Sequence, residues 1–309
     1  MDGNLWNRLY RMIRRACKPL VNRPRMGRPR VYGTDDVLAV WAFAALTDLP
    51  VYKAQEKLRS PVVRWWLGRY WLWPGVLPSV STLSRRAKDS EFHWLLRRVL
   101  RRLRRALGLH PTAHVVLDST LLLTGAYSRD PESRWTCHGG KWFRGYALHA
   151  ICDLNGQLWA WHVTSANVQE MKVARRLIRQ LAAQKLRVSL VIGDTGYDSE
   201  PLHQLVRRRL NAPLLAPLNL RGAKSQSWRK RQPGRVAADE LLRTPQGAAW
   251  MDERSTIERW NSWFKGSSRV SMLPHHARRL RRVRLWIDLK LAVFFVHQRL
   301  LQHDLKHAA

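Results

Sequence analysis

The hydrophobic pattern of the chain changes from helical to strand-like near residue 110, and this change limits the folds available to it. In residues 91–107, apolar side chains recur at helical spacing and arginines occupy many of the remaining positions. Gly108 and Pro111 follow, and these residue types end helices. We therefore predict an all-α N-terminal domain that is followed by a domain containing a sheet.

Five apolar segments after this boundary have the length and composition of β-strands. They are residues 114–117, 142–152, 158–164, 188–192 and 213–218. Asn155-Gly156 is typical of a hairpin turn, so the first three strands are predicted to form an antiparallel meander. Helices are expected at residues 169–185, from Asp198, and around residues 251–265. This order is that of the ribonuclease-H-like fold, an α/β fold with a mixed five-stranded sheet and flanking helices.

The predicted domain organisation has four parts. They are a basic arm at residues 1–33, a helical domain at 34–110, the α/β domain at 111–272 with a small basic insertion at about 219–248, and a C-terminal helix at 273–309. In the helical domain, short helices separated by tight turns suit a helix-turn-helix reader of DNA, although a plain helical bundle fits the same pattern.

The charge balance points to a polyanionic partner. The chain has 55 Lys and Arg against 22 Asp and Glu, a formal net charge of +33. Such an excess is far larger than solubility requires, and it favours double-stranded DNA. An anionic membrane is the competing partner, but the start of the chain lacks the apolar core of a signal peptide. The three cysteines lack the spacing of a disulfide framework, so we expect a reducing, intracellular compartment.

Four arginines outside the α/β domain are candidate DNA-binding residues. Arg28 and Arg30 lie in an Arg- and Pro-rich stretch that can enter a minor groove as an extended arm, and a disordered charged leader is the alternative. Arg85 and Arg86 lie on the predicted reader helix, which begins after two serines.

Two aspartates follow apolar strands in the α/β domain. Asp118 comes directly after residues 115–117, and Asp194 comes directly after residues 191–193. Phosphodiester cleavage by two metal ions needs two or three converging carboxylates, and strand ends hold such groups rigidly. Adjacent aspartates repel each other, and Mg²⁺ or Mn²⁺ with oxygen ligands relieves this repulsion. A turn-capping role for each of the two aspartates is the alternative.

Helical geometry helps to choose a third acid among Asp252, Glu253 and Glu258. At about 100° per residue, Arg254, Glu258 and Lys265 fall on one stripe of the predicted helix. Glu253 points about 140° away from Glu258. A carboxylate flanked by two cations suits a site for metal-bound phosphate, although a surface ion pair produces the same local spacing.

Taken together, these motifs resemble the DDE transposases of bacterial insertion sequences, in the group whose last helix carries a Tyr, Arg, Glu, Lys signature. Arg254, Glu258 and Lys265 match this signature in their spacing, and Met251 stands at the Tyr position. Residues 117–120 (LDST) and 193–198 (GDTGYD) are similar to the motifs around the first and second Asp. The resemblance extends from about residue 27 to about residue 300.

The resemblance implies a catalytic triad of Asp118, Asp194 and Glu258 that holds two Mg²⁺ or Mn²⁺ ions per active site. Arg254 and Lys265 would hold DNA phosphates. Water would first free a 3′-OH at each end of the element, and this hydroxyl would then attack target DNA. The family resemblance also implies a homodimer on two DNA ends, in the cytoplasm and associated with the bacterial nucleoid.

Two questions stay open at this point. Trp228, in the basic insertion, lies where family members use an aromatic residue to stack on a flipped base, and a packing role fits it equally well. The competing functions are a domesticated DNA-binding protein without catalysis and a related nuclease that only hydrolyses DNA. The presence of all three acids argues against the first of these.

Overall fold

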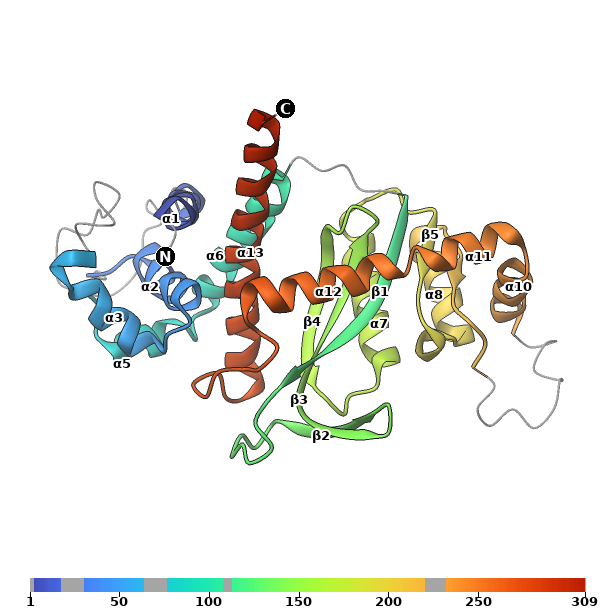
Figure 1. Ribbon diagram of the computed structural model, residues 1–309, viewed down its shortest axis with the longest axis horizontal. Coiled ribbons are helices and arrows are strands. Elements are labelled where there is room, and N and C mark those ends of the chain that lie inside the picture. Colours follow the sequence, from blue (N-terminus) through green and yellow to red (C-terminus); the bar gives the residue numbers. More distant parts are fainter. Residues whose placement is uncertain (1–2, 18–30, 64–76, 108–112, 220–231, 309) are drawn as a thin grey trace. The chain divides into compact units, whose positions relative to one another are not determined.

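Figure 1 shows a computed structural model of the protein, which describes residues 3–17, 31–63, 77–107, 113–219 and 232–308. The chain divides into two compact units. Unit 1 consists of residues 1–108 and 285–309, and unit 2 consists of residues 109–284. The sequence placed the C-terminal helix apart from other domains, whereas its residues from Leu285 onward group with unit 1.

The described part of unit 1 is helical. Its elements are α1 (Gly3–Cys17), α2 (Thr34–Thr47), α3 (Val51–Arg59), α5 (Val80–Arg86), α6 (Ser90–Ala106) and most of α13 (Leu280–Ala308). The apolar stripe of α6 is buried as its spacing predicts. A helix is also expected at residues 62–73 from their apolar spacing, and this range lies largely outside the described residues.

The first residues of unit 1 form a helix where the sequence analysis expected an arm. In α1, Trp6, Leu9 and Ile13 are buried at helical spacing, and the other face carries arginines such as Arg11. This burial explains why residues 3–17 are helical in spite of their charge. The Arg- and Pro-rich stretch that suggested the arm lies outside the described residues.

Unit 2 contains a sheet flanked by helices (Figure 1). The strands are β1 (His114–Leu123), β2 (Arg134–His138), β3 (Lys141–Asp153), β4 (Leu158–Ser165), β5 (Leu190–Ile192) and β6 (Leu214–Leu215). The helices are α7 (Glu170–Ala182), the 3₁₀-helix η3 (Thr195–Tyr197), α8 (Glu200–Leu210), α10 (Pro233–Leu242), α11 (Pro245–Asp252) and α12 (Ser255–Ser268).

The sheet topology confirms the predicted ribonuclease-H-like fold. β3 pairs antiparallel with β1 and with β4, while β5 runs parallel to β1 and β6 runs parallel to β5. These five strands are the predicted ones. β2 is an addition that pairs with the first residues of β3, and its sequence lacks the apolar alternation that predicts a strand.

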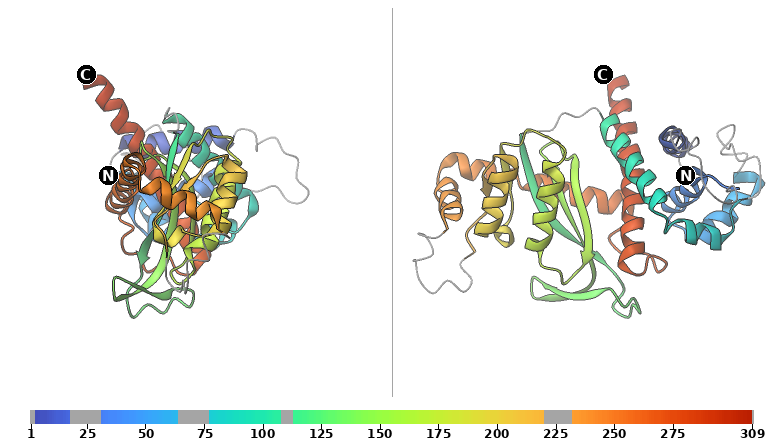
Figure 2. Two further views of the ribbon diagram at one scale, coloured as in Figure 1. Left: turned by 90° about the vertical axis from the view of Figure 1, so that its right-hand side faces the viewer. Right: turned by 180° about the vertical axis from the view of Figure 1, so that it is seen from behind.

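Helices cover both faces of this sheet. Because side chains alternate along a strand, Val115 and Leu117 of β1 face one side, where they share a core with Leu177 of α7 and Val206 of α8. The opposite face of β1 and β3 meets α12. Figure 1 shows α12 in front of the sheet, and the view from behind in Figure 2 brings α7 forward.

The helix expected around residues 251–265 is two helices. α11 ends at Asp252 and α12 begins at Ser255, with tight backbone bonds such as Arg254 N to Met251 O between them. The basic insertion expected at about 219–248 contains α10 and the start of α11 in its described part.

No single helix of the described residues is both long and apolar enough to cross a bilayer. In the part of the chain that the structure describes, α2 and α3 taken together reach the required length and composition, but the two helices are bent by 101°.

A buried ion pair holds α10 against the rest of unit 2. The carboxylate of Asp198 is completely buried, and the Arg235 guanidinium donates to it from Nε at 2.9 Å and from Nη2 at 2.5 Å. The Asn219 backbone N–H donates to the same carboxylate at 2.7 Å. Burial by itself raises the pKa of Asp198, but the bonds from His203 and Arg235 outweigh it, so the pKa lies below its ordinary value. Asp198 is therefore ionised at neutral pH.

We predict that Arg235→Ala lowers the free energy of unfolding by about 3–5 kcal/mol at pH 7, because it leaves a buried carboxylate without its main partner. Urea denaturation followed by circular dichroism measures this loss. Arg243→Ala is the matched control, since Arg243 pairs with Asp239 of the same helix but its side chain is 68% exposed. The control should cost under about 1 kcal/mol. Equal losses of unfolding free energy in the two variants would contradict a stabilising role for the buried ion pair of Arg235 and Asp198.

Candidate active site

The two predicted aspartates occupy equivalent positions on neighbouring parallel strands. β1 pairs with β5 in the register that sets Val116 opposite Ile192. Asp118 and Asp194 each stand two residues beyond that pair, so the sheet itself brings the acids together. The sequence suggested that the first strand ends just before Asp118. In the structure β1 continues past Asp118 to Leu123. It is β5 that ends, at Ile192.

Each aspartate is held by a neighbouring group. Asn261 of α12 donates from Nδ2 to Oδ2 of Asp118 at 3.1 Å. Asp194 accepts a hydrogen bond from the Gly196 backbone N–H at 2.8 Å and thereby caps η3. The turn-capping role that the sequence offered as an alternative is thus found at Asp194, and it leaves the second carboxylate oxygen of Asp194 outside this bond.

Glu170 is a third acid near the pair, and the sequence analysis did not single it out. It is the first residue of α7, and the Ser119 hydroxyl donates to its carboxylate. An acid in the first turn of a helix is common because it interacts with the helix dipole, so the sequence carried no separate signal for it. Its place beside Asp118 follows from the packing of α7 against β1 and β3.

Burial and neighbouring charges raise the pKa of Asp118 and of Glu170. Burial is the largest cause for Asp118, and the charges of Asp194 and Glu170 add to it, so its pKa rises to about 7. A backbone hydrogen bond at Ser119 and the charge of Arg254 oppose the rise. The pKa of Glu170 is also raised, by burial and then by Asp194. Burial and the neighbouring acids therefore oppose the ionisation of Asp118 and Glu170.

Glu258, the predicted third ligand, is turned toward Arg254. The side chain of Glu258 is 54% exposed, and its Oε1 lies 2.7 Å from Nη2 of Arg254. Arg254 in turn lowers the pKa of Asp118 through its charge, whereas Glu258 is not among the residues that line the cavity beside the aspartates. Among the described residues, no group of three or more acids, histidines and cysteines is already arranged to hold a metal ion.

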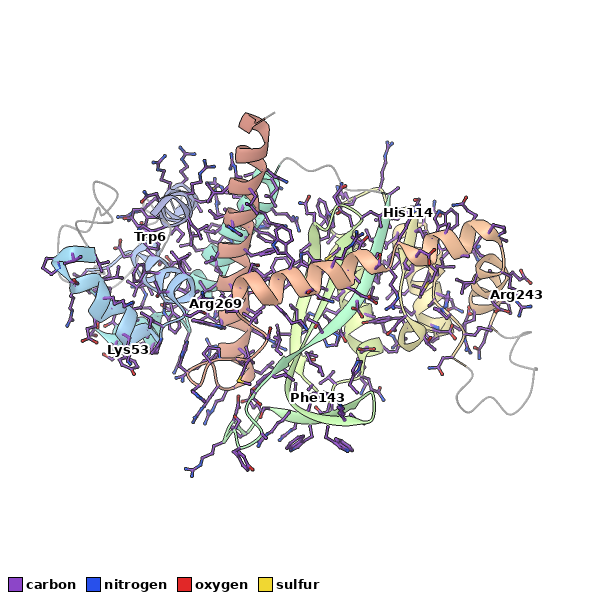
Figure 3. The ribbon with its side chains drawn as sticks, in the orientation of Figure 1. Trp6, Lys53, His114, Phe143, Arg243 and Arg269 are labelled. Atoms are coloured by element: carbon purple, nitrogen blue, oxygen red, sulfur yellow. The ribbon has the colours of Figure 1, made fainter. Side chains whose placement is uncertain are left out.

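Glu253 points to a different part of unit 2. Its Oε2 lies 2.7 Å from Nδ1 of His114, the first residue of β1. The Trp250 ring contacts the same histidine edge-on, with 5.6 Å between ring centroids. Figure 3 labels His114 at the end of β1 that is remote from the β2–β3 turn. Glu253 thus contacts a residue that lies four positions before Asp118 in the chain.

A cavity of about 610 Å³ opens beside the acids. Asp118, Glu170, Asp194 and Lys265 all line it. His149 also lines it, although the histidine is buried and its Nε2 lies 2.9 Å from the Thr164 hydroxyl. Burial lowers the pKa of His149 to about 4, so the ring is neutral at pH 7.

The predicted DNA-binding arginines of unit 1 differ in their surroundings. Arg85 is exposed at the end of α5. Arg86 is buried, and its guanidinium donates to the Tyr32 carbonyl at 3.2 Å and to the Thr34 hydroxyl at 2.9 Å. These bonds give Arg86 a structural role, so its predicted DNA contact is not retained. Arg28, Arg30 and Trp228 lie outside the described residues.

The sheet, its flanking helices and the paired aspartates define a ribonuclease-H-like protein with an acidic site. The family model of the transposase DDE domain matches residues 109–295, which include every strand of unit 2. This match covers more than half of the chain, and the protein therefore belongs to the DDE-domain transposase family. No curated protein matches the sequence.

The raised pKa of Asp118 predicts a dependence of stability on pH. Without divalent cations, the folded protein binds the Asp118 proton more tightly than the unfolded chain does. The associated stability is fully present below about pH 4, the ordinary range of an aspartate, and it is lost as the pH rises through about 7. Asp118→Asn removes the charge of this buried carboxylate, so this variant should melt at a higher temperature than the wild type at pH 8.

Thermal unfolding in EDTA at pH 8 and pH 5 measures the difference in melting temperature between Asp118→Asn and the wild type. This difference should be smaller at pH 5. Asp252→Asn is the control, because Asp252 is exposed at the end of α11. A melting temperature of Asp118→Asn at or below that of the wild type at pH 8 would show that the carboxylate is not under electrostatic strain.

Proposed function

We propose that this transposase cuts DNA at the ends of a mobile element and joins the freed 3′-OH to target DNA. The observation that carries the proposal is the register of β1 and β5, which puts Asp118 and Asp194 side by side at a cavity that Lys265 also lines. Two converging carboxylates with a nearby cation suit the in-line displacement of a phosphodiester.

The acids fit hard divalent cations such as Mg²⁺ or Mn²⁺. Oxygen ligands suit these ions, and a bound cation would offset both the burial of Asp118 and the nearby charges of Asp194 and Glu170, which raise the pKa of Asp118 to about 7. Asp118 and Asp194 would each bind an ion directly, and Glu258 would complete the ligand set for two ions. When bound, the ions activate the attacking oxygen and stabilise the leaving oxygen.

The chain's own residues prepare the site for this chemistry. The Asn261 amide orients Asp118 from the α12 side, and the Gly196 N–H fixes Asp194. Arg254 and Lys265 hold DNA phosphates as charge-assisted pairs. Binding of phosphate draws Arg254 away from Glu258, whose half-exposed ion pair is worth under about 1 kcal/mol, and frees this carboxylate for metal.

The DNA partner also accounts for the charge of the whole chain. A net charge of +33 favours a long DNA contact through phosphate neutralisation. Unit 1, with exposed cations such as Arg85, is proposed to recognise the terminal repeats of the element. A homodimer is proposed because two element ends must be cut and joined together. The chain would act in the cytoplasm, on DNA of the bacterial nucleoid.

We predict that Asp118→Asn, Asp194→Asn and Glu258→Gln each reduce DNA cleavage by orders of magnitude and leave DNA binding nearly unchanged, because they remove metal ligands and not phosphate contacts. A duplex taken from the DNA next to the gene, incubated with Mg²⁺ in a single-turnover assay, measures cleavage. A gel-shift experiment in Ca²⁺ measures binding in parallel.

Glu253→Gln is the matched control, since Glu253 contacts His114 and should be dispensable for cleavage. A fully active Glu258→Gln together with an inactive Glu170→Gln would move the third ligand to α7. DNA binding without cleavage by the wild type would favour the non-catalytic alternative, and hydrolysis without joining would favour the nuclease.

A further inference from the structure

Four arginines of unit 2 surround a hollow of about 440 Å³ that shares no lining residue with the cavity beside the acids. This arginine pocket is lined by Arg129, Pro131, Arg278, Arg279 and Arg282. The first two residues belong to the loop after β1, and the other three stand just before α13 or in its first turn. Because these two segments are far apart in the chain, only the fold brings the arginines together.

Hydrogen bonds to two acids join the segments of the arginine pocket. The Asp130 carboxylate accepts from the Arg279 backbone N–H at 2.9 Å and from the Tyr146 hydroxyl at 2.6 Å. The Glu132 carboxylate accepts from the Leu280 backbone N–H at 2.9 Å. The backbone of Arg279 is left-handed, with a φ of 67°, which is uncommon for a residue with a side chain. The bond to Asp130 holds this conformation, so the fold fixes the backbone on both sides of the pocket.

The guanidinium groups of the pocket carry charge that the described part of the chain does not pair. All four arginines are exposed, and none of them forms an ion pair with another described residue. The neighbouring acids Asp130 and Glu132 accept backbone hydrogen bonds instead. Like charges that gather in one place repel each other, so a bound anion would stabilise them.

The chemistry of the guanidinium group indicates which anion this is. A guanidinium is planar and always charged, and it donates two parallel hydrogen bonds to a phosphate. Four such groups around one hollow therefore suit phosphate groups. The net charge of +33 makes the phosphates of DNA the expected source.

The distance from the arginine pocket to the aspartates fits a ligand with repeated phosphates. Asp130 bonds to Tyr146, which lies four residues along β3 from Ala150, the partner of Asp118. Four residues of an antiparallel strand span about 14 Å. Successive nucleotides of a DNA duplex rise by about 3.4 Å, so this distance corresponds to roughly four nucleotides. A DNA duplex can therefore extend from the cavity to the pocket.

We propose that the arginine pocket binds the DNA backbone about four or more nucleotides from the scissile phosphate. This inference rests on the proposed function, since it takes one DNA phosphate to lie at the aspartates. Contacts to phosphates fix the position of DNA and read no sequence. A duplex that is held at a second point cannot turn freely about the scissile phosphate, so the pocket helps to position this phosphate for attack.

The test removes one arginine from each segment, in the variant Arg129→Ala/Arg282→Ala. Both side chains are exposed, so the variant should keep the wild-type melting temperature. Fluorescence anisotropy in Ca²⁺ measures the affinity of the full-length protein for a duplex that carries the end of the element, over a range of salt concentrations. Each phosphate contact contributes about 0.9 to the slope of log K against log salt. The slope of the variant should therefore be about 1.8 less steep than that of the wild type.

Arg175→Ala/Arg179→Ala is the matched control. It removes the same charge from the exposed face of α7, where neither arginine lines the cavity or the arginine pocket. The control should keep the wild-type salt slope. An equal decrease of the slope in both variants would show a general effect of charge and would overturn the proposal.

A second measurement locates the contact on the DNA. A series of duplexes carries one neutral methylphosphonate each, at successive positions outward from the cleavage position. The wild type should lose affinity at the cleavage position and again about four or more nucleotides to one side of it. Arg129→Ala/Arg282→Ala should lose affinity at the cleavage position alone, because it no longer contacts the more distant phosphates.

An unchanged salt slope or an unchanged methylphosphonate pattern in Arg129→Ala/Arg282→Ala would overturn the proposal. Calorimetry with inorganic pyrophosphate covers the other source of phosphate. A loss of pyrophosphate binding without a change in DNA binding would assign the arginine pocket to a free phosphate ligand and would also overturn the proposal. A wild type that binds no DNA would instead count against the proposed function, on which this inference rests.

Discussion

The parallel pairing of β1 with β5 is the constraint on which the rest of the site depends. Three backbone pairs, ending at Val116 and Ile192, fix the strands in one register. A shift of one residue would turn the side chains of one strand to the other face of the sheet and would separate the acids. The hydrophobic core between the sheet, α7 and α8 specifies this register, because it requires Val115, Leu117 and Val191 on the same side. Burial of apolar side chains therefore places two like charges together, although their repulsion opposes it.

The pKa values of the site depend on this repulsion and on the burial of the acids. Asp118 keeps a raised pKa because burial, together with the charges of Asp194 and Glu170, outweighs the backbone hydrogen bond at Ser119 and the charge of Arg254. A pair of acids whose charge is not fully balanced destabilises the free protein. A bound cation would remove the repulsion between them, so this repulsion contributes to the free energy of cation binding. The proposed function accounts for a local acidic site in a strongly basic protein, because the general surface would attract DNA and the acids would hold the ions that act on it.

The sequence predicted much of the fold and part of the site. Apolar runs and the Asn155-Gly156 turn predicted five strands in their correct order. The argument that separated Glu253 from Glu258 assumed one continuous helix, whereas the structure has a break between α11 and α12. Other features depend on packing that no local pattern records. Glu170 reaches Asp118 only because α7 crosses the sheet, and Arg86 is buried only because Tyr32 and Thr34 accept its hydrogen bonds. The hairpin strand β2 has no apolar alternation, and the buried stripe of α1 was obscured by the many arginines around it.

The central claim is that Asp118 and Asp194 are joint metal ligands. Anomalous diffraction from crystals of the full chain soaked in Mn²⁺ tests it most directly, because it locates the ion without relying on activity. The account predicts an anomalous peak in contact with both carboxylates in the wild type, and a weakened or missing peak in Asp118→Asn. A peak that is remote from both aspartates, or one that persists unchanged in Asp118→Asn, would contradict it.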